Sequence, residues 1–333
     1  MTPALAAPLF VASITLMLAA SAVFASRLDH IGLRLGMPET LLGLLTALAA
    51  DAPELSSAVS ALVQHQRAVA VGVVVGSNAF NIAAMVGLSA IVATRVRAQH
   101  EALELEAFVG LWLLAVALAV VAGGLPATVG IGLVAVVAVP YVLLLAAGPR
   151  LARRLPLGVA ELRFVRRSFG EEHRPEQALD SRREALQLLL VLLAALCVIV
   201  AGSVGAVRSA TDLADAWSVP ETLVGVLVLA ILTSLPNAWT GVRFGLQRRG
   251  SALMSETLNS NSINLVAGIA LPAALGSLTA FSSLDVFGLA WLFAMTAAAL
   301  VLFGRRNGAG RRAGAFLIVL YAVFIAVQIA ARA

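Results

Sequence analysis

The chain contains little charge and only one cysteine. Charged residues make up 12% of its 333 residues, hydrophobic residues make up 60%, and every basic residue is an arginine. So low a charge content excludes an ordinary soluble domain, and the single Cys197 excludes an internal disulfide framework. Apolar stretches of about twenty residues, long enough to cross a hydrocarbon core, recur along the whole chain. The composition therefore predicts an all-α polytopic membrane protein.

Ten apolar stretches are expected to span the membrane. One long polar segment, 149–184, contains nine arginines and separates two halves of five spans each, 1–148 and 185–333. It has too few apolar residues to form a core, so we interpret it as an arginine-rich cytoplasmic linker. The expected spans are residues 4–26, 38–63, 68–94, 105–123, 126–148, 185–206, 220–244, 251–277, 284–303 and 313–331.

The arginines also predict the orientation of the chain. Twenty of them follow odd-numbered spans, and only Arg67, Arg208 and Arg332 lie on the other side. The positive-inside rule then places both termini outside, most simply in a prokaryotic inner membrane. Because the basic residues report topology and contact with anionic lipids, no nucleic-acid partner is expected.

A polar pattern occurs twice inside these apolar helices. In residues 38–81, Pro-Glu-Thr-Leu is followed by Asp-Ala-Pro-Glu and then Gly-Ser-Asn-Ala-Phe-Asn. In residues 220–264, Pro-Glu-Thr-Leu is followed by Ser-Leu-Pro-Asn and then Asn-Ser-Asn-Ser-Ile-Asn. An odd number of spans in each half inverts the second copy relative to the first. Inverted repeats with broken helices are typical of secondary transporters, and polar residues in the membrane are expensive enough to be functional rather than a by-product of duplication.

The proline in each copy predicts a break in its helix. Pro53 and Pro236 lack an amide hydrogen and clash with the preceding turn. The residues before them, Ala52 and Leu235, are expected to leave helical geometry. Backbone oxygens freed by such a break can bind a cation where they face a protein cavity. A simple packing kink is the alternative role.

The first copy carries two carboxylates, Asp51 and Glu54, three residues apart on one helix face. Two carboxylates this close do not both ionise readily unless a cation lies between them, so a metal ion and protons should compete for the pair. The hydroxyl and amide oxygens nearby suit sodium or calcium rather than zinc or copper. The same side chains could also serve as hydrogen bonds between helices.

The two segments resemble the alpha-repeats of the cation/calcium antiporter superfamily, which includes sodium/calcium exchangers. In that family one helix carries a Thr-Ser-Leu-Pro-Glu type motif and the next carries a Gly-Ser-Asn-x-x-Asn/Asp type motif. The counterparts here are residues 50–54 with 76–81, and 233–237 with 259–264. The resemblance implies an ion site at Glu54, Ser77, Asn81, Thr233, Ser234, Asn237, Ser260 and Asn264, to which we add Asp51 and Glu256.

The chain departs from this pattern in its charges. Asn237 stands where the family pattern has a carboxylate, and Asn264 stands where the pattern has either asparagine or aspartate, whereas Asp51 is an additional carboxylate. Glu256 stands where the family tends to have asparagine. The central charge is therefore shifted towards the first half, with Glu256 as a third acidic member.

The sequence thus predicts a secondary active antiporter that exchanges Ca²⁺ for Na⁺ or H⁺, with these ions as substrates and no cofactor. A Na⁺/H⁺ exchanger without calcium transport is the nearest alternative. A channel, or a sensor that has lost ion coupling, is a further alternative that Asn237 supports. An enzyme is not expected, because no nucleophile and base are arranged together. A monomer surrounded by lipid should suffice for transport.

Overall fold

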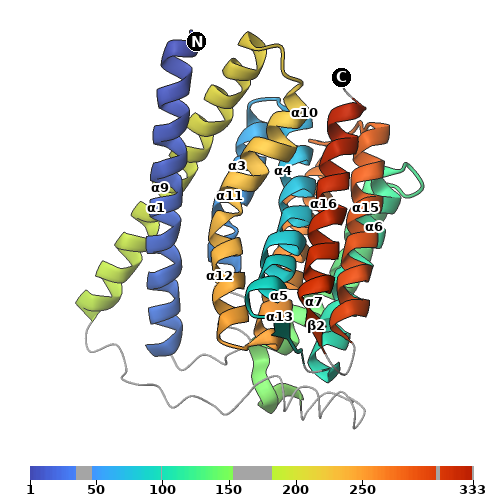
Figure 1. The fold of residues 1–333 in the computed structure, drawn as a ribbon. Helices are drawn as coiled ribbons and strands as arrows, with labels where there is room; N and C mark the ends of the chain where they lie inside the picture. The colour runs from blue at the N-terminus through green and yellow to red at the C-terminus, as the bar shows by residue number, and fades with distance from the viewer. Residues whose placement is uncertain (35–46, 99, 153–181, 305–307, 332–333) are drawn as a thin grey trace.

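Long helices account for nearly all of the structure. The computed structural model describes the chain except for residues 35–46, 99, 153–181, 305–307 and 332–333 (Figure 1). Three segments of wider π-helical turns, labelled η, continue neighbouring α-helices. The elements are α1 (Pro3–Arg34), α3 (Ala52–Val63), α4 (Arg67–Asn81), η1 (Ile82–Leu88), α5 (Ser89–Val92), β1 (Arg95–Val96), α6 (His100–Val121), α7 (Ala127–Ala152), α9 (Arg182–Ala216), α10 (Glu221–Leu223), η2 (Val224–Leu229), α11 (Ala230–Thr233), α12 (Leu235–Leu246), α13 (Gly250–Leu265), η3 (Val266–Ala270), α14 (Leu271–Ala274), α15 (Ser283–Phe303), β2 (Ala309–Gly310) and α16 (Arg311–Ala330).

Many of these helices are long and apolar enough to cross a membrane. Among the described residues, seven helices have the length and composition of a membrane span. An eighth candidate is the pair of helices Glu221–Thr233 and Leu235–Leu246, which is bent by 48° at its break. Two expected spans are not among them. The span 38–63 lies partly outside the described residues, and the span 251–277 corresponds to the unbroken but more polar run from α13 to α14. The protein is an integral membrane protein, and the seven helices are Pro3–Leu28, Arg67–Val92, Leu103–Val121, Ala127–Leu145, Leu186–Ala216, Ser283–Phe303 and Arg311–Ala330.

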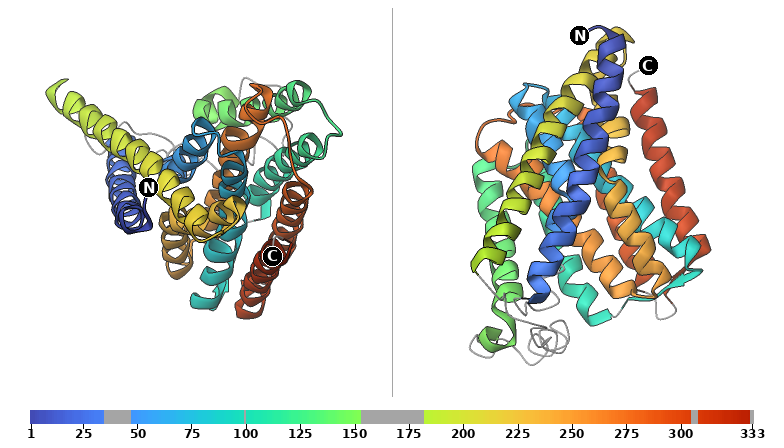
Figure 2. Two further views of the ribbon diagram at one scale, coloured as in Figure 1. Left: turned by 90° about the horizontal axis from the view of Figure 1, so that it is seen from above. Right: turned by 90° about the vertical axis from the view of Figure 1, so that its left-hand side faces the viewer.

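The central helices carry the repeated pattern. The helices α1 and α9 pack along each other at one side of the molecule, and α9 diverges from the bundle at one end (Figures 1 and 2). The helices α3, α4, α11, α12 and α13 lie in the middle, and α6, α15 and α16 cover them on the other side. The described part of α4 and η1 is buried almost throughout. This placement keeps the polar motifs away from lipid.

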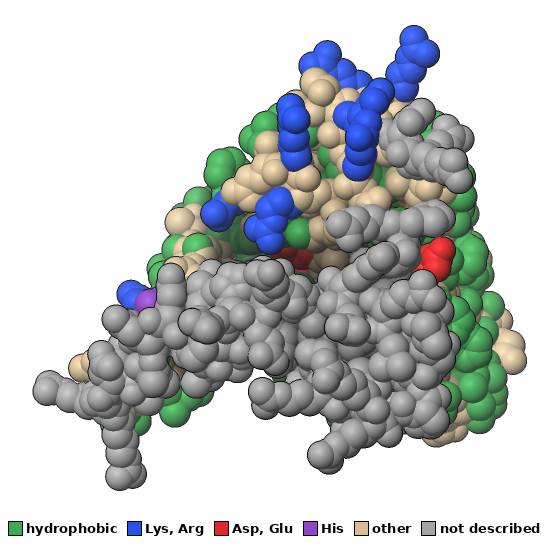
Figure 3. All heavy atoms as spheres, turned by 90° about the horizontal axis from the view of Figure 1, so that it is seen from below, with side chains coloured by type: hydrophobic (Ala, Val, Ile, Leu, Met, Phe, Trp, Pro, Cys, Tyr) green, Lys and Arg blue, Asp and Glu red, His purple; other side chains and the backbone are tan. Residues whose placement is uncertain are grey.

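The connections between helices fall at two ends of the bundle. At one end β1 pairs antiparallel with β2, and Gly250 lies against the backbone of Arg97. At the other end Arg67 donates to Thr279 Oγ1 at 3.3 Å, and both termini lie at this end (Figure 1). Described arginines gather at the end that carries β1 and β2 (Figure 3). The loops that follow the expected spans 3, 7 and 9 therefore share one end, as the sequence predicts.

Candidate cation site

Each copy of the pattern contains a helix break beside its proline. Asp51 interrupts the helix before α3, and Ser234 interrupts it between α11 and α12. The prolines occupy the first turn of the new helix, where a missing amide hydrogen is tolerated. The breaks were therefore predicted correctly, but the expectation for Ala52 and Leu235 was wrong by one residue, because these two begin the new helices.

Five side chains from both halves form one hydrogen-bonded cluster. Asn237 Nδ2 donates to Asp51 Oδ1 at 2.7 Å and to Glu54 Oε1 at 3.0 Å. Ser260 Oγ donates to the same Asp51 oxygen at 2.6 Å, and Asn264 Nδ2 donates to Glu54 Oε2. All five residues are at most 1% exposed. The pair of carboxylates on α3 and its boundary is thus held by donors from α12 and α13, which belong to the other half.

The remaining predicted residues lie around this cluster at different distances from it. Asn81 Nδ2 donates to Ser260 Oγ at 3.1 Å, which joins α4 to the cluster. The hydroxyl oxygens of Ser77 and Ser234 lie near the Glu54 carboxylate, although Ser77 Oγ donates to the carbonyl of Val74 at 3.2 Å and Ser234 Oγ has no hydrogen-bond partner. Thr233 instead donates to the carbonyl of Leu229 in its own helix at 2.8 Å. The structure therefore brings Asn81, Ser77 and Ser234 to the cluster, and the hydroxyl hydrogens of Ser77 and Thr233 are both donated within their own helices.

Glu256 stands apart from the five-residue cluster. It lies on α13, one helical turn before Ser260, and is 7% exposed. The charges of Asp51 and Arg249 both act on it. No hydrogen bond joins Glu256 to the cluster among the described contacts. It is therefore a neighbour of the central site rather than a member of it.

Six oxygen atoms of the predicted residues are buried without a hydrogen-bond partner. Buried polar groups nearly always have partners, so these oxygens can accept a cation. Carboxylate, amide and hydroxyl oxygens are the ligands of calcium and other hard cations. No group of three or more His, Cys, Asp or Glu side chains that could hold a metal ion occurs in the described part of the chain, so neutral oxygens would have to complete a cation site here. The six atoms are Asp51 Oδ2, Asn81 Oδ1, Ser234 Oγ, Asn237 Oδ1, Asn264 Oδ1 and Glu256 Oε1.

A reciprocal pair of asparagines joins the two halves beside the site. Asn78 Nδ2 donates to the carbonyl of Asn261 at 3.0 Å, and Asn261 Nδ2 donates to the carbonyl of Asn78 at 3.1 Å. The two residues occupy equivalent positions in the two copies of the motif. Their side-chain oxygens also accept hydrogen bonds from Asn264 and Asn81. Sequence analysis had not assigned them to the site, and they connect the helices in the way that small polar motifs do.

A second group of polar residues lies on the other face of α13. Tyr141 donates to Asn259 Oδ1 at 2.8 Å, and Ser255 Oγ donates to the carboxylate of Glu106. Asn259 Nδ2 lies 3.5 Å from Ser255 Oγ and links the two contacts. This chain connects α13 to α6 and α7. It was missed because Glu106, Tyr141 and Ser255 lie outside the repeated motifs, and only Asn259 belongs to one.

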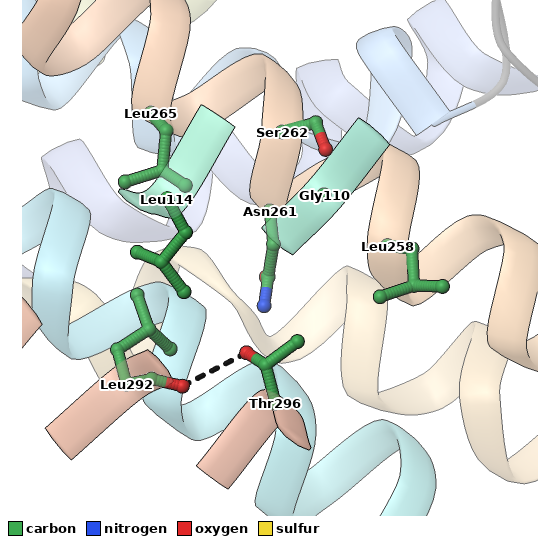
Figure 4. Close-up of a pocket in the computed structure, with 8 residues that line it drawn as sticks. All are labelled: Gly110, Leu114, Leu258, Asn261, Ser262, Leu265, Leu292 and Thr296. Carbon is green, nitrogen blue, oxygen red and sulfur yellow. Dashed lines mark hydrogen bonds between the residues drawn. The ribbon is translucent and has the colours of Figure 1, made fainter. Parts of the chain in front are cut away.

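A small cavity also borders α13. Its lining is mostly apolar and comes from α6, α13 and α15 (Figure 4). Asn261 points into it, although the Asn261 amide is already used in bonds to Asn78 and Asn81. Thr296, also on its wall, donates to the carbonyl of Leu292 at 2.8 Å (Figure 4). Because it contains no charged side chain, we do not regard it as the cation site.

Comparison with known proteins identifies the family. The sequence profile described as "Sodium/calcium exchanger protein" matches residues 5–147 and 187–330, which include both repeats. The chain belongs to this family. Membership supports the expected antiport of Ca²⁺ against Na⁺ or H⁺, and it indicates a transporter family rather than an enzyme family. A search of curated protein sequences found no significant match.

Solved structures of exchangers share the fold. The sodium-calcium exchanger NCX_Mj, soaked with 10 mM Na⁺ and zero Ca²⁺, matches with a TM-score of 0.62 and 20% identity, over 98% of this chain and 99% of that chain. The H⁺/Ca²⁺ exchanger CAX matches with a TM-score of 0.72 and 15% identity, over 97% of this chain and 86% of that chain. At these identities the likeness establishes the common fold, and the ion specificity has to be argued from the residues of this chain.

Proposed function

We propose that the protein exchanges Ca²⁺ for Na⁺ or H⁺ by alternating access to the central cluster. The observation that carries the proposal is the contact of Asn237 with both Asp51 and Glu54, because it closes one buried site from two inverted halves. Unpartnered oxygens of the same residues supply further ligands. Ser77, Asn81 and Ser234 complete the ligand set, with Thr233 at its edge.

The charge of the cluster explains why ions would exchange rather than leak. Two ionised carboxylates buried in a low-dielectric interior are unfavourable, and hydrogen bonds from neutral donors do not cancel their charge. One Ca²⁺, or two monovalent cations, would neutralise Asp51 and Glu54. A cation-loaded site can therefore be exposed to the opposite side of the membrane more readily than an empty one. Calcium and the driving ions exclude each other from the site.

The proposal includes the architecture expected from the sequence, ten spans in two inverted halves, 1–148 and 185–333. The reciprocal bonds between Asn78 and Asn261 support it, because they join equivalent positions of the repeats. The paired breaks at Asp51 and Ser234 support it as well. We assign the arginine-rich end to the cytoplasm of a prokaryotic cell, and both termini to the outside. The expected linker 149–184 is assigned to the cytoplasm as well, and its residues 153–181 lie outside the described part of the chain. A single chain contains the whole cluster, so a monomer in lipid suffices.

Flux measurements in proteoliposomes test this function. An outward gradient of Na⁺ or H⁺ should drive Ca²⁺ uptake by the wild type, and Glu54→Gln should abolish it because the substitution removes a charged ligand. Asp212→Asn is a matched control, since it removes a carboxylate that pairs with the amino group of Met1 at the end of the bundle. Normal exchange by Glu54→Gln would show that the site is assigned wrongly.

The Na⁺/H⁺ alternative is favoured by one observation, the use of amides at position 237, where the family pattern has a carboxylate, and at position 264, where it has either asparagine or aspartate. Asn237 and Asn264 lower the charge available to a divalent ion. A panel of calcium, sodium, magnesium and manganese against pH distinguishes the two functions. Sodium-driven proton flux without any calcium flux would establish the alternative and exclude calcium antiport, whereas a conductance far above carrier rates would indicate a channel.

A further inference from the structure

One face of α13 contacts polar side chains that have no part in the proposed exchange of ions. Ser255 Oγ donates to the carboxylate of Glu106 on α6, and Tyr141 on α7 donates to Asn259 Oδ1 at 2.8 Å. Asn259 Nδ2 lies 3.5 Å from Ser255 Oγ and connects these two bonds. We refer to the four side chains as the Glu106 chain.

Glu106 lies inside an apolar helix. It belongs to the segment Leu103–Val121, which is long and apolar enough to span a membrane. A carboxylate in such a segment is unfavourable and is a candidate for a functional role. In the described part of the protein no basic side chain lies within 4 Å of Glu106, and the hydrogen-bond donor that the structure gives it is Ser255. The carboxylate is therefore held by α13 rather than by a described arginine.

The same helix carries donors for the central cluster on another face. Ser260 donates to Asp51, and Asn264 donates to Glu54. Each of these two donors follows a member of the Glu106 chain by five residues, which places it about 140° further around the helix at about 100° per residue. Polar contacts therefore hold α13 on two nearly opposite faces, with the central cluster on one face and with α6 and α7 on the other.

The rotation of α13 about its axis decides whether its donors reach the carboxylates. Side-chain oxygens lie about 6 Å from a helix axis, so a rotation by about 20° moves them by about 2 Å. A shift of this size away from Asp51 takes the 2.6 Å bond from Ser260 Oγ to Asp51 Oδ1 beyond the roughly 3.0 Å limit of such bonds. A small rotation of α13 would therefore change the affinity of the central site for cations.

Apolar packing alone does not fix this rotation. A small cavity lies between α13, α6 and α15 (Figure 4). Gly110 of α6 and Ser262 of α13 line it, and a Cβ at Gly110 would lie 3.7 Å from Ser262 Oγ, so small residues of the two helices face each other there. Among the 16 residues of α13, those with large apolar side chains are Leu253, Met254, Leu258, Ile263 and Leu265.

The carboxylate of Glu106 sets the direction of the other bonds in the chain. An ionised carboxylate only accepts hydrogen bonds, so Ser255 donates to it and can accept from the amide nitrogen of Asn259. The amide oxygen of Asn259 then faces Tyr141, whose hydroxyl donates to it. Without an accepting oxygen at position 106, Ser255 would turn its hydroxyl to another acceptor, and the order of the remaining bonds would be lost.

We propose that Glu106 is a positioning residue for the central cation site, and that the Glu106 chain holds α13 at the rotation at which Ser260 and Asn264 meet the two carboxylates. Glu106 itself touches no transported ion in this arrangement. The inference rests on the proposed function and adds to it a residue from outside both copies of the repeated motif.

Equilibrium binding of radioactive calcium to purified variants tests this role. Glu106→Leu removes the accepting oxygen and Tyr141→Phe removes the donor at the other end, and each should raise the dissociation constant for Ca²⁺ about threefold. Because both act through one rotation of α13, the double variant should also show about threefold rather than about ninefold. Glu106→Gln keeps an accepting oxygen and should stay within twofold of the wild type.

Trp112→Phe is the matched control. Trp112 Nε1 donates to the carbonyl of Leu133 at 3.0 Å, which joins α6 to α7 without involving α13. This variant should lower the unfolding temperature and leave the dissociation constant for Ca²⁺ unchanged. Tyr141→Phe removes a single oxygen, so it keeps the test decisive if Glu106→Leu folds poorly.

Several results would overturn the inference. They are unchanged affinity in Tyr141→Phe, a ninefold effect in the double variant, a loss in Glu106→Gln as large as that in Glu106→Leu, and an equal loss in Trp112→Phe. Failure of the proposed function would appear differently, because the wild type itself would then show no calcium binding and no gradient-driven calcium flux, and both proposals would be overturned.

Discussion

Replacing Asn237 with aspartate tests how the central cluster balances its charge. The amide nitrogen of Asn237 donates to Asp51 Oδ1 at 2.7 Å and to Glu54 Oε1 at 3.0 Å. A hydrogen bond contributes roughly 1.5–3 kcal/mol when its acceptor is charged and roughly 0.5–1.5 kcal/mol when it is neutral. Because the two carboxylates do not both ionise readily without a cation, losing both bonds costs about 2–4.5 kcal/mol in the ion-free protein. The new carboxylate also repels the two that are present. Asn237→Asp should therefore lower the unfolding temperature in the absence of calcium.

Calcium should reverse this effect. In the variant a donor that competes with the cation is replaced by a charged ligand, and calcium affinity rises with the number of charged ligands. We expect the dissociation constant for Ca²⁺ to fall by about tenfold, which corresponds to roughly 1.4 kcal/mol. At the same calcium concentration, well above both dissociation constants, the stabilisation by calcium should then increase by about that amount.

Thermal unfolding of the purified protein over a calcium series, together with calcium binding, measures both effects. Asn259→Asp is the matched control, because Asn259 is a buried asparagine on α13 whose oxygen accepts from Tyr141 rather than from the cluster. It should be destabilised without any gain in calcium affinity. If Asn237→Asp bound calcium no more tightly than the wild type, the cluster would not be the calcium site.

Two further predictions concern the contact between the halves. Asn261→Ala removes the bond that Asn261 Nδ2 donates to the Asn78 carbonyl and the bond that Asn261 Oδ1 accepts from Asn81, whereas the bond from Asn78 to the backbone carbonyl at position 261 remains. At roughly 0.6 kcal/mol for an average hydrogen bond between membrane helices, losing two bonds should destabilise the protein by about 1 kcal/mol in thermal unfolding. An unchanged unfolding temperature would mean that these bonds do not hold the helices together. Gly225→Leu should reduce the yield of monodisperse protein in size-exclusion chromatography, because a Cβ there would lie 2.5 Å from the carbonyl oxygen of Val69. Gly132→Leu, where a Cβ meets nothing within 4 Å, should leave the yield unchanged, and equal yields from both variants would contradict the close packing.

The repeated motif made much of the site predictable. Proline within an apolar helix predicts a break, and both breaks lie beside Pro53 and Pro236. Polar side chains are so unfavourable in lipid that the copies were expected to face each other, and Asp51, Glu54 and Asn237 do come together. The constant offset in residue number between the two copies was enough to identify Glu54 and Asn237 as equivalent positions that meet at the site.

Other features could not be predicted from one sequence. Glu256, Ser260 and Asn264 are spaced four residues apart, which places them on one face of α13. The spacing does not show that Glu256 Oε1 is buried without a hydrogen-bond partner. That depends on which turn of the other half each residue faces. The contact between Glu106 and Ser255 joins positions 149 residues apart and follows no repeat. Such pairings are set by the packing of whole helices.

Equivalent positions of the two copies of the motif meet beside the site, as Asn78 and Asn261 do, whereas the charged side chains of the site come from one copy. Glu54 corresponds to Asn237 in the repeat, and Asp51 corresponds to Ser234. Carboxylates only accept hydrogen bonds, so a site with carboxylates at every one of these positions would have no donors for its own ion-free state. In this chain Asn237 donates to both carboxylates and satisfies part of their polarity. The amide of Asn237 does not neutralise the carboxylates, so a cation or protons must still bind before the buried site can be exposed to the opposite side of the membrane. The amides of the second half therefore stabilise the ion-free protein, while the uncompensated charge of the two carboxylates still requires a cation or protons during exchange.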